Sequence, residues 1–259
     1  MPTLRVIPVI DLKHGRVVRG VAGRREEYRP IESLLCDTPS PAVVGAAFRK
    51  LGFEHIYLAD LDAIAGAQPD WAVLESLIDC GLRLWVDAGI TSRERAAALA
   101  RFEHKSESLA GIVVGLESMA SPEELAATFH AIGPGRAIFS LDLRDGTPVV
   151  RAKEWQHISA EAIVREVVEL GIDRIIVLDI ARVGLGEGVG TVDLCRRLKY
   201  DHPALKITAG GGVRNTDDLM RLSDAGCESV LVASALHDGR LTAADLRRFG
   251  GVHTDSDPL

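Results

Sequence analysis

Pro8-Val9-Ile10-Asp11-Leu12-Lys13-His14-Gly15, near the start of the chain, is matched mid-chain by Phe139-Ser140-Leu141-Asp142-Leu143-Arg144-Asp145-Gly146. In each copy an apolar run ends in Asp-Leu, followed by a cation, one further residue and a glycine. Such a run is typical of a buried strand that carries a charge at its carboxyl end. The aspartates lie about half of the 259-residue chain apart, which indicates an internal repeat. Two unrelated strand ends with turn-capping aspartates are the alternative, which the repetition disfavours.

The composition excludes several classes of protein. Hydrophobic residues make up 47% of the chain and the net charge is −7, so neither nucleic acid nor an anionic membrane is expected as a partner. The four cysteines form no CxxC pair and the eight histidines show no metal-ligand spacing. Neither a disulfide framework nor a metal site is therefore expected. With no signal-peptide pattern and no apolar run of membrane-spanning length, the chain is expected to be cytoplasmic.

Strand and helix patterns alternate eight times along the chain. The predicted strands cover residues 5–11, 55–60, 82–87, 111–114, 137–142, 174–179, 206–209 and 229–233. The predicted helices cover residues 41–51, 70–78, 92–102, 121 onward, 159–170, 191–199, 216–225 and 241–249. Apolar strands that are each followed by a helix predict a parallel sheet covered by helices.

Eight such units favour an α/β fold of the (β/α)8 TIM-barrel type. An open doubly wound sheet is the alternative, but no GxGxxG follows the first strand as a dinucleotide site would require. We expect a single barrel over residues 1–250 and a flexible tail at 251–259. Residues 13–39 are expected to form a loop or a short hairpin.

The two halves of the chain also match beyond the opening motif. Gly52-Phe53-Glu54-His55 aligns with Gly171-Ile172-Asp173-Arg174, and Gly89 aligns with Gly212. We therefore expect two duplicated half-barrels, with Asp11 on the first strand and Asp142 on the fifth. These strands face each other across the barrel, and catalytic groups in this fold lie at the carboxyl ends of the strands. The two carboxylates are expected to form an acid–base pair, and the sequence leaves open which one is the acid.

A phosphate site is predicted after the last two strands. Gly210-Gly211-Gly212 follows the seventh strand and precedes a helix that begins near Thr216. Glycine lets backbone N–H groups approach an anion closely, and a helix N-terminus favours negative charge. Ala233 and Ser234, after the eighth strand, are expected to supply the other wall and a hydroxyl group. A tight turn that binds nothing is the alternative.

Taken together, these motifs resemble those of the histidine-biosynthesis barrels. The resemblance rests on Ile-Asp-Leu-Lys-x-Gly-x-x-Val-Arg from Ile10, Asp-x-Arg-Asp-Gly from Asp142, Ala-Gly-Gly-Gly-Val from Ala209 and Ala-Leu-x-x-Gly-Arg-Leu-Thr from Ala235. Within that family the chain is more similar to the isomerases of phosphoribosylformimino-aminoimidazole carboxamide ribotide than to the cyclases. Cyclases carry Cys-Leu-Asp where this chain has Val9-Ile10-Asp11.

The resemblance implies an Amadori-type rearrangement of an aldose to a ketose, with Asp11 and Asp142 as acid and base and no metal or organic cofactor. It implies substrate or phosphate contacts for a further set of residues, namely Gly211, Gly212, Ala233, Ser234, Lys13, Arg19 and Trp155. The expected partner is a small phosphorylated substrate, and the oligomeric state is not indicated. The alternatives are a divergent paralogue with a mono-phosphorylated substrate, for example in one-carbon cofactor biosynthesis, and a non-catalytic phosphate-binding barrel.

The chain departs from this family after the third and fourth strands. The isomerases usually carry Gly-Gly-Gly-Ile-Arg and Gly-Thr-Ala there, whereas this chain has Asp87-Ala88-Gly89-Ile90-Thr91 and Gly115-Leu116-Glu117-Ser118. Asp87 and Glu117 place negative charge where a second phosphate is expected. The substrate is therefore predicted to carry one phosphate, or an uncharged or cationic group at its other end. Arg24-Arg25-Glu26-Glu27 is predicted to be a solvated loop.

Overall fold

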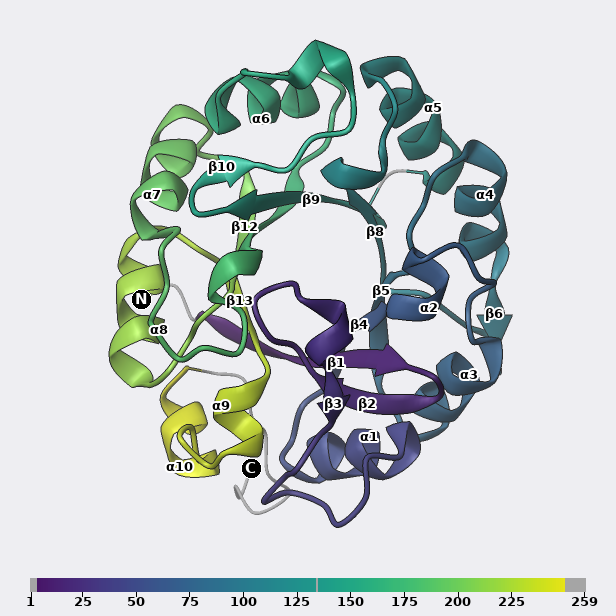
Figure 1. Cartoon of the computed structure of the whole chain (residues 1–259), viewed down its shortest axis with the longest axis vertical. Helices are drawn as coiled ribbons and strands as arrows, with labels where there is room; N and C mark the ends of the chain where they lie inside the picture. The colour runs from purple at the N-terminus through teal and green to yellow at the C-terminus, as the bar shows by residue number, and fades with distance from the viewer. Residues whose placement is uncertain (1–3, 134, 250–259) are drawn as a thin grey trace.

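A closed ring of strands surrounded by helices forms the molecule (Figure 1). The structure is a computed structural model of the chain and describes residues 4–133 and 135–249. The bounds of 1–250 for a single barrel stay a prediction, and the predicted tail at 251–259 lies outside the described residues. None of the helices described is long and apolar enough to cross a membrane.

Eight parallel strands make the ring, in the order of the chain. They are β1 (Arg5–Lys13), β4 (His55–Asp60), β5 (Arg83–Asp87), β8 (Gly111–Gly115), β9 (Ala137–Arg144), β11 (Arg174–Asp179), β12 (Lys206–Gly210) and β13 (Ser229–Val232). The ring closes because β1 pairs in parallel with β13, from Arg5 opposite Ser229 to Pro8 opposite Val232. This pairing confirms the (β/α)8 TIM barrel and excludes the open sheet.

Alternate residues of each strand face opposite sides of the barrel wall, because side chains alternate along a strand. One buried cluster lies inside the ring and includes Ile7, Trp85 and Ile138. The other lies between the strands and the helices, and includes Ile10 and Phe139. Both faces of the strands are therefore apolar, which explains their nearly continuous hydrophobic sequences.

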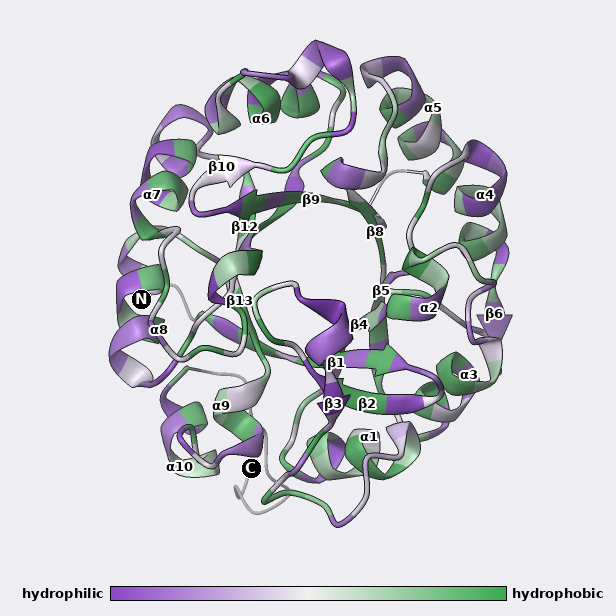
Figure 2. Cartoon of the chain, viewed as in Figure 1, coloured by the Kyte–Doolittle hydropathy of each residue, from purple (hydrophilic) through white to green (hydrophobic). Residues whose placement is uncertain are grey.

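Helices cover the outside of the ring. They are α1 (Pro41–Lys50), α3 (Trp71–Asp79), α4 (Arg93–Arg101), α5 (Pro122–Ile132), α6 (Ala160–Glu169), α7 (Val192–Asp201) and α8 (Thr216–Asp224). Side-chain oxygens of Ser92, Ser121, Ser159 and Asn215 accept a backbone N–H in the first turn of four of them, which stabilises these helix starts. Figure 2 shows hydrophobic residues on the helix sides that face the strands and hydrophilic residues outside, as expected for amphipathic helices.

Several short elements were not predicted. They are α2 (Leu61–Ile64), α9 (Ser234–His237), the hairpin of β6 (Glu103–His104) with β7 (Glu107–Ser108), and β10 (Thr147–Pro148) beside β9. The predicted last helix at 241–249 is α10 (Ala243–Leu246) followed by the 3-10 turn η5 (Arg247–Phe249). Two other 3-10 turns follow barrel strands, η2 (Leu116–Ser118) after β8 and η4 (Ile180–Arg182) after β11, and η3 (Lys153–Trp155) precedes α6.

The segment at 13–39 contains the short hairpin that was one of its two predicted forms. Strand β2 (Arg16–Arg19) runs antiparallel to β1 and pairs with β3 (Arg29–Pro30). Between β2 and β3 lies the 3-10 turn η1 (Arg25–Glu27), which Figure 1 shows over the mouth of the ring. The duplication of two half-barrels stays a prediction.

Candidate active site

A cavity of about 330 Å³ opens at the carboxyl ends of the barrel strands. Its walls come from most of the ring and from the loops that follow β2 and β11. Six of the residues predicted from the sequence line it, namely Asp11, Asp142, Gly211, Gly212, Ala233 and Ser234. The barrel thus collects into one cavity residues that are more than 200 positions apart in the chain.

Asp11 and Asp142 face each other across this cavity because of strand periodicity and ring order. Asp11 lies on β1 at even spacing from Ile7, and Asp142 lies on β9 at even spacing from Ile138, both of which point inside the ring. Three strands separate β1 from β9 in either direction around the ring of eight. The opening motif and its mid-chain copy therefore deliver their carboxyl groups to opposite walls.

Burial makes both carboxyl groups reluctant to ionise. It raises the pKa of Asp11 to about 7, against the lowering effect of the Arg25 charge. It raises the pKa of Asp142 to about 8, with the negative charges of Glu117 and Asp87 acting in the same direction. The Ser140 hydroxyl donates to Asp142 Oδ1 at 3.0 Å and partly offsets this rise. Near neutral pH, the cavity can therefore hold one protonated and one ionised carboxyl group on opposite walls.

The wall at β5 and β8 carries two further acidic side chains, Asp87 and Glu117, which both line the cavity. Asp87 is held in place by the Gly89 N–H, 3.1 Å from Oδ1, and by the Tyr57 hydroxyl, 3.3 Å from Oδ2. Burial raises the pKa of Asp87 to about 6. The charge that the sequence placed on this side of the mouth therefore points into the cavity and is not turned away to solvent.

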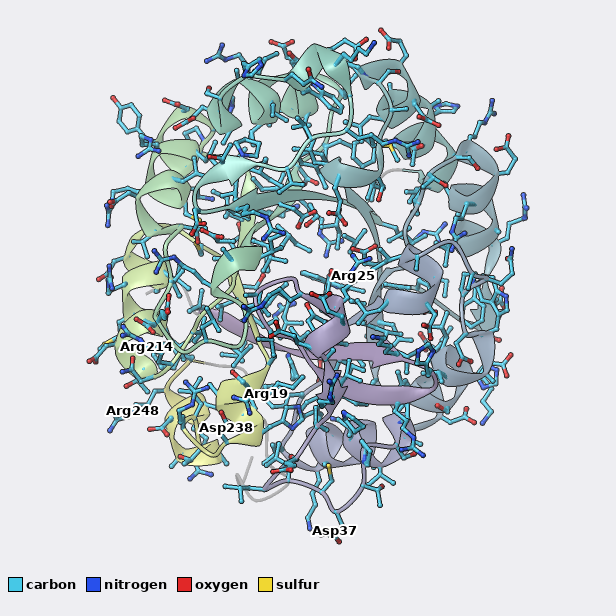
Figure 3. The ribbon with its side chains drawn as sticks, in the orientation of Figure 1. Arg19, Arg25, Asp37, Arg214, Asp238 and Arg248 are labelled. Carbon is cyan, nitrogen blue, oxygen red and sulfur yellow. The ribbon has the colours of Figure 1, made fainter. Side chains whose placement is uncertain are left out.

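Arg25 also lines the cavity, so the prediction of a solvated loop at 24–27 is wrong for this residue. Figure 3 shows the labelled Arg25 near the centre of the ring. Its Nη2 lies 3.5 Å from Glu117 Oε1, and its backbone carbonyl accepts a hydrogen bond of 2.7 Å from Lys13 Nζ. No local pattern marks this arginine, because its place depends on the hairpin folding back over the mouth.

Gly211 and Gly212 form the floor of the mouth beyond β12. Their φ angles are +88° and +87°, in the region that favours glycine. A Cβ atom on Gly211 would lie 2.5 Å from the carbonyl oxygen of Asp179, and one on Gly212 would lie 2.5 Å from that of Gly188. Only glycine fits at these two positions, and both residues line the cavity with their backbone.

Ser234 stands beside this floor at the start of α9. Its hydroxyl accepts a hydrogen bond of 3.0 Å from Arg240 Nη2. Arg240 was not predicted as a site residue, although it lies in the Ala-Leu-x-x-Gly-Arg-Leu-Thr motif that carried the resemblance. The motif could have identified it, because it places a guanidinium group six residues after the serine.

Three of the predicted contact residues do not line the cavity in this structure: Lys13, Arg19 and Trp155. The Lys13 amine donates to the backbone of the η1 turn, as described above. Both terminal nitrogens of Arg19 bind the Asp238 carboxylate, at 2.7 and 2.9 Å (Figure 3). Trp155 is 1% exposed and its indole N–H donates to Glu166 Oε2 at 2.8 Å. The first two hold the loops of the mouth in place, and Trp155 packs in the core.

Among the residues described, no group of three or more His, Cys, Asp or Glu side chains could hold a metal ion. The side chains that line the cavity offer opposed carboxyl groups for proton transfer, a glycine floor, and an acidic wall with one arginine beside it.

Known proteins are similar to this chain over most of its length. A family model described as histidine biosynthesis protein matches residues 5–242. The chain is 31% identical over 248 residues to the 1-(5-phosphoribosyl)-5-((5-phosphoribosylamino)methylideneamino) imidazole-4-carboxamide isomerase of Methylocella silvestris, which covers 92% of this chain and 94% of that protein. It is 30% identical over 246 residues to the isomerase of the same name from Deinococcus radiodurans, with 93% and 97% covered. An uncharacterized protein of Methanocaldococcus jannaschii is 30% identical over 250 residues, with 95% and 100% covered.

Proposed function

The chain belongs to the histidine biosynthesis protein family, and from this membership we propose that it is an aldose–ketose isomerase acting on a phosphorylated ribosylamine in the cytoplasm. The observation that carries the proposal is the pair of opposed carboxyl groups of Asp11 and Asp142, both with raised pKa values, in one cavity with a glycine floor. Relatives that are named isomerases support the same class of reaction.

The proposed reaction is an Amadori rearrangement, in which an aldosylamine becomes an aminoketose. A general acid protonates the ring oxygen, the bond from C1 to that oxygen breaks, and an iminium forms between C1 and the nitrogen. A general base then removes the proton from C2, which gives an enaminol. The enaminol loses its O2 proton and gains one at C1. Two protons are gained and two are lost, C1 is reduced and C2 is oxidised, so the reaction needs no external oxidant or reductant.

We assign the acid to Asp142 and the base to Asp11, because the pKa of Asp142 is raised further, to about 8 against about 7. Two carboxyl groups whose environments separate their pKa values can divide acid and base roles at one pH. Asp142 lies nearer the acidic wall, and the charges of Glu117 and Asp87 favour its protonated form. The Arg25 charge favours ionised Asp11.

The substrate phosphate is proposed to bind at Gly211 and Gly212, with the Ser234 hydroxyl as a further donor. Arg240 donates to this hydroxyl at 3.0 Å and also to the Asp238 carboxylate at 3.1 Å, so it holds the serine in place while its own charge is paired. The phosphate then anchors one end of the sugar, while the reacting carbons lie between β1 and β9.

The direct test is turnover of N-(5-phosphoribosyl) amines labelled with carbon-13 at C1. Nuclear magnetic resonance is expected to show the anomeric C1 signal replaced by that of a methylene carbon bonded to nitrogen, as the aminoketose requires. Amines with aliphatic, aromatic and imidazole substituents should be compared, with the bis-phosphorylated substrate named for the relatives among them. Saturable binding without conversion of any of them would contradict the isomerase and favour a non-catalytic phosphate-binding barrel.

The pH dependence of kcat/KM is expected to be bell-shaped. Activity falls below about pH 7 because Asp11 becomes protonated and cannot act as the base. It falls above about pH 8 because Asp142 loses the proton that the acid must donate. Steady-state rates between pH 5 and 10 measure both limbs.

Two substitutions are expected to move these limbs differently. Glu117→Gln removes a charge that raises the pKa of Asp142, so the alkaline limb alone moves to lower pH. Arg25→Gln removes a charge that lowers the pKa of both aspartates, so both limbs move to higher pH. Glu123→Gln, an exposed position on α5, serves as the control and should leave the profile unchanged. Limbs that stay in place in both variants would refute the assignment of Asp11 and Asp142 to the profile.

A further inference from the structure

Building on the proposed function, we propose that the end of the substrate lying against β5 and β8 carries a positively charged nitrogen, such as a protonated amine or amidine, bound by Asp87 and Glu117. The proposed phosphate site formed by Gly211, Gly212 and Ser234, called the phosphate cradle below, would then bind the single phosphate of the substrate. The substrate class is accordingly a ribosylamine with one phosphate and one cationic end.

The two sides of the mouth differ in charge although they are built alike. Gly89 after β5 and Gly212 after β12 both have positive φ, +63° and +87°. On the β12 side, however, the strand ends in Gly210, whereas β5 ends in Asp87. The position that has only backbone atoms after β12 therefore carries a carboxyl group after β5. An anion there would meet Asp87 directly.

The carboxyl group of Asp87 is held on the cavity wall, where it can accept a hydrogen bond from a substrate group. One of its oxygens accepts the Gly89 N–H and the other accepts the Tyr57 hydroxyl. These contacts fix the carboxyl group on the wall. Its pKa of about 6 leaves it mainly ionised at pH 7.5, so it presents negative charge under the conditions of an assay.

The guanidinium group of Arg25 already lies against this wall. Its position is a second observation that the wall can bind a cation. Arg25 Nη2 is 3.5 Å from Glu117 Oε1. Its charge lowers the pKa of Asp11, Asp87 and Asp142 alike, so a cation in this place acts on all three. Arg25 comes from a short turn and its side chain is 42% exposed. Its guanidinium group shows that this wall accepts a cation, and in the proposal a substrate nitrogen takes its place beside Glu117.

The other cation on the lining does not neutralise this wall. Arg144, at the end of β9, is exposed, and its Nη2 lies 3.4 Å from the position of a Cβ atom on Gly23, in the loop after β2. Four carboxyl groups thus line the cavity, from Asp11, Asp87, Glu117 and Asp142, and Arg25 is the cation placed among them. A second phosphate, as in the substrate named for the isomerase relatives with its two 5-phosphoribosyl groups, would add negative charge to this set.

The test is calorimetric binding at pH 7.5 of three matched series of probes with chains of three to six carbons. These are ω-aminoalkyl phosphates, ω-hydroxyalkyl phosphates and α,ω-alkanediol bisphosphates. The best amine is expected to bind about tenfold tighter than the alcohol of the same length, a difference of about 1.4 kcal/mol. The bisphosphate is expected to bind more weakly than the alcohol.

Substitutions of Asp87 and Glu117 test whether these residues cause the preference for the amine over the alcohol. In Asp87→Asn and Glu117→Gln the preference for the amine should shrink or vanish while the affinity for the alcohol persists. Glu123→Gln should retain the full preference. An amine preference that survives both wall substitutions would overturn the proposal.

The outcomes also separate this inference from the isomerase proposal. Tightest binding of the bisphosphate would overturn the cationic end and leave the isomerase and its phosphate cradle standing. Equal binding of amine and alcohol would likewise overturn only the cationic end. If no probe bound, and inorganic phosphate did not bind either, the phosphate cradle would fail, and the inference would fail with it.

Discussion

Asp11→Asn and Asp142→Asn are each expected to lower kcat by about 10²–10⁴-fold, the usual contribution of a positioned general acid or base. The asparagine amide keeps the shape of the carboxyl group but neither accepts the C2 proton nor donates one to the ring oxygen. The proposed phosphate site at Gly211 and Gly212 follows another strand, so the Kd of the substrate should change only a few-fold. Single-turnover kinetics and equilibrium binding measure the two quantities separately.

Neither substitution is expected to unfold the barrel. Burial disfavours the ionised form of both side chains, so a neutral amide removes an unfavourable charge at neutral pH. The melting temperature should therefore stay equal or rise. Asp62→Asn is a suitable control, because Asp62 lies near the mouth on α2 and accepts the His14 N–H outside the cavity. Ordinary turnover by either Asp11→Asn or Asp142→Asn would exclude that residue as acid or base.

Gly211→Ala and Gly212→Ala are expected to weaken binding of inorganic phosphate by about tenfold or more, which corresponds to at least 1.4 kcal/mol. A methyl group at either position meets a carbonyl oxygen at 2.5 Å, and the backbone must move to relieve the contact. The N–H groups then no longer converge on the anion. Both variants should also melt at lower temperature, because φ near +88° is strained for alanine.

Gly171→Ala separates backbone strain from the clash. Gly171 has a φ of +84°, close to those of the two cradle glycines, but a Cβ atom there would meet nothing within 4 Å. It should cost about 1–2 kcal/mol of stability and leave phosphate affinity unchanged. If Gly211→Ala and Gly212→Ala bound phosphate as tightly as Gly171→Ala, the phosphate would have to bind elsewhere in the mouth.

The sequence determined the barrel because each of the eight ring strands carries a local signal and helix patterns alternate with them. The predicted strand at 174–179 and that at 55–60 coincide with β11 and β4, and glycine or proline marks the neighbouring boundaries. The sequence also placed Asp11 and Asp142 on strands that face each other, since strand order in a barrel follows chain order. The charge of Asp87 and Glu117 was visible for the same reason, because Asp87 ends one predicted strand and Glu117 lies three residues after the next.

Only the tertiary structure decided what the loops do. Arg25 reaches the acidic wall through a segment that Val183, far away in the chain, holds by accepting the Ala22 N–H, and that Lys13 holds from the neighbouring strand. Trp155 lies in the core because Glu166 on α6 accepts its indole N–H, and no local pattern distinguishes that from a position over the substrate. The raised pKa values of the aspartates likewise depend on burial by many elements at once. Strand periodicity is a local property of the chain, whereas loop position and desolvation arise from contacts between distant segments. For that reason the sequence located the two opposed carboxyl groups but not the arginine that lies among them.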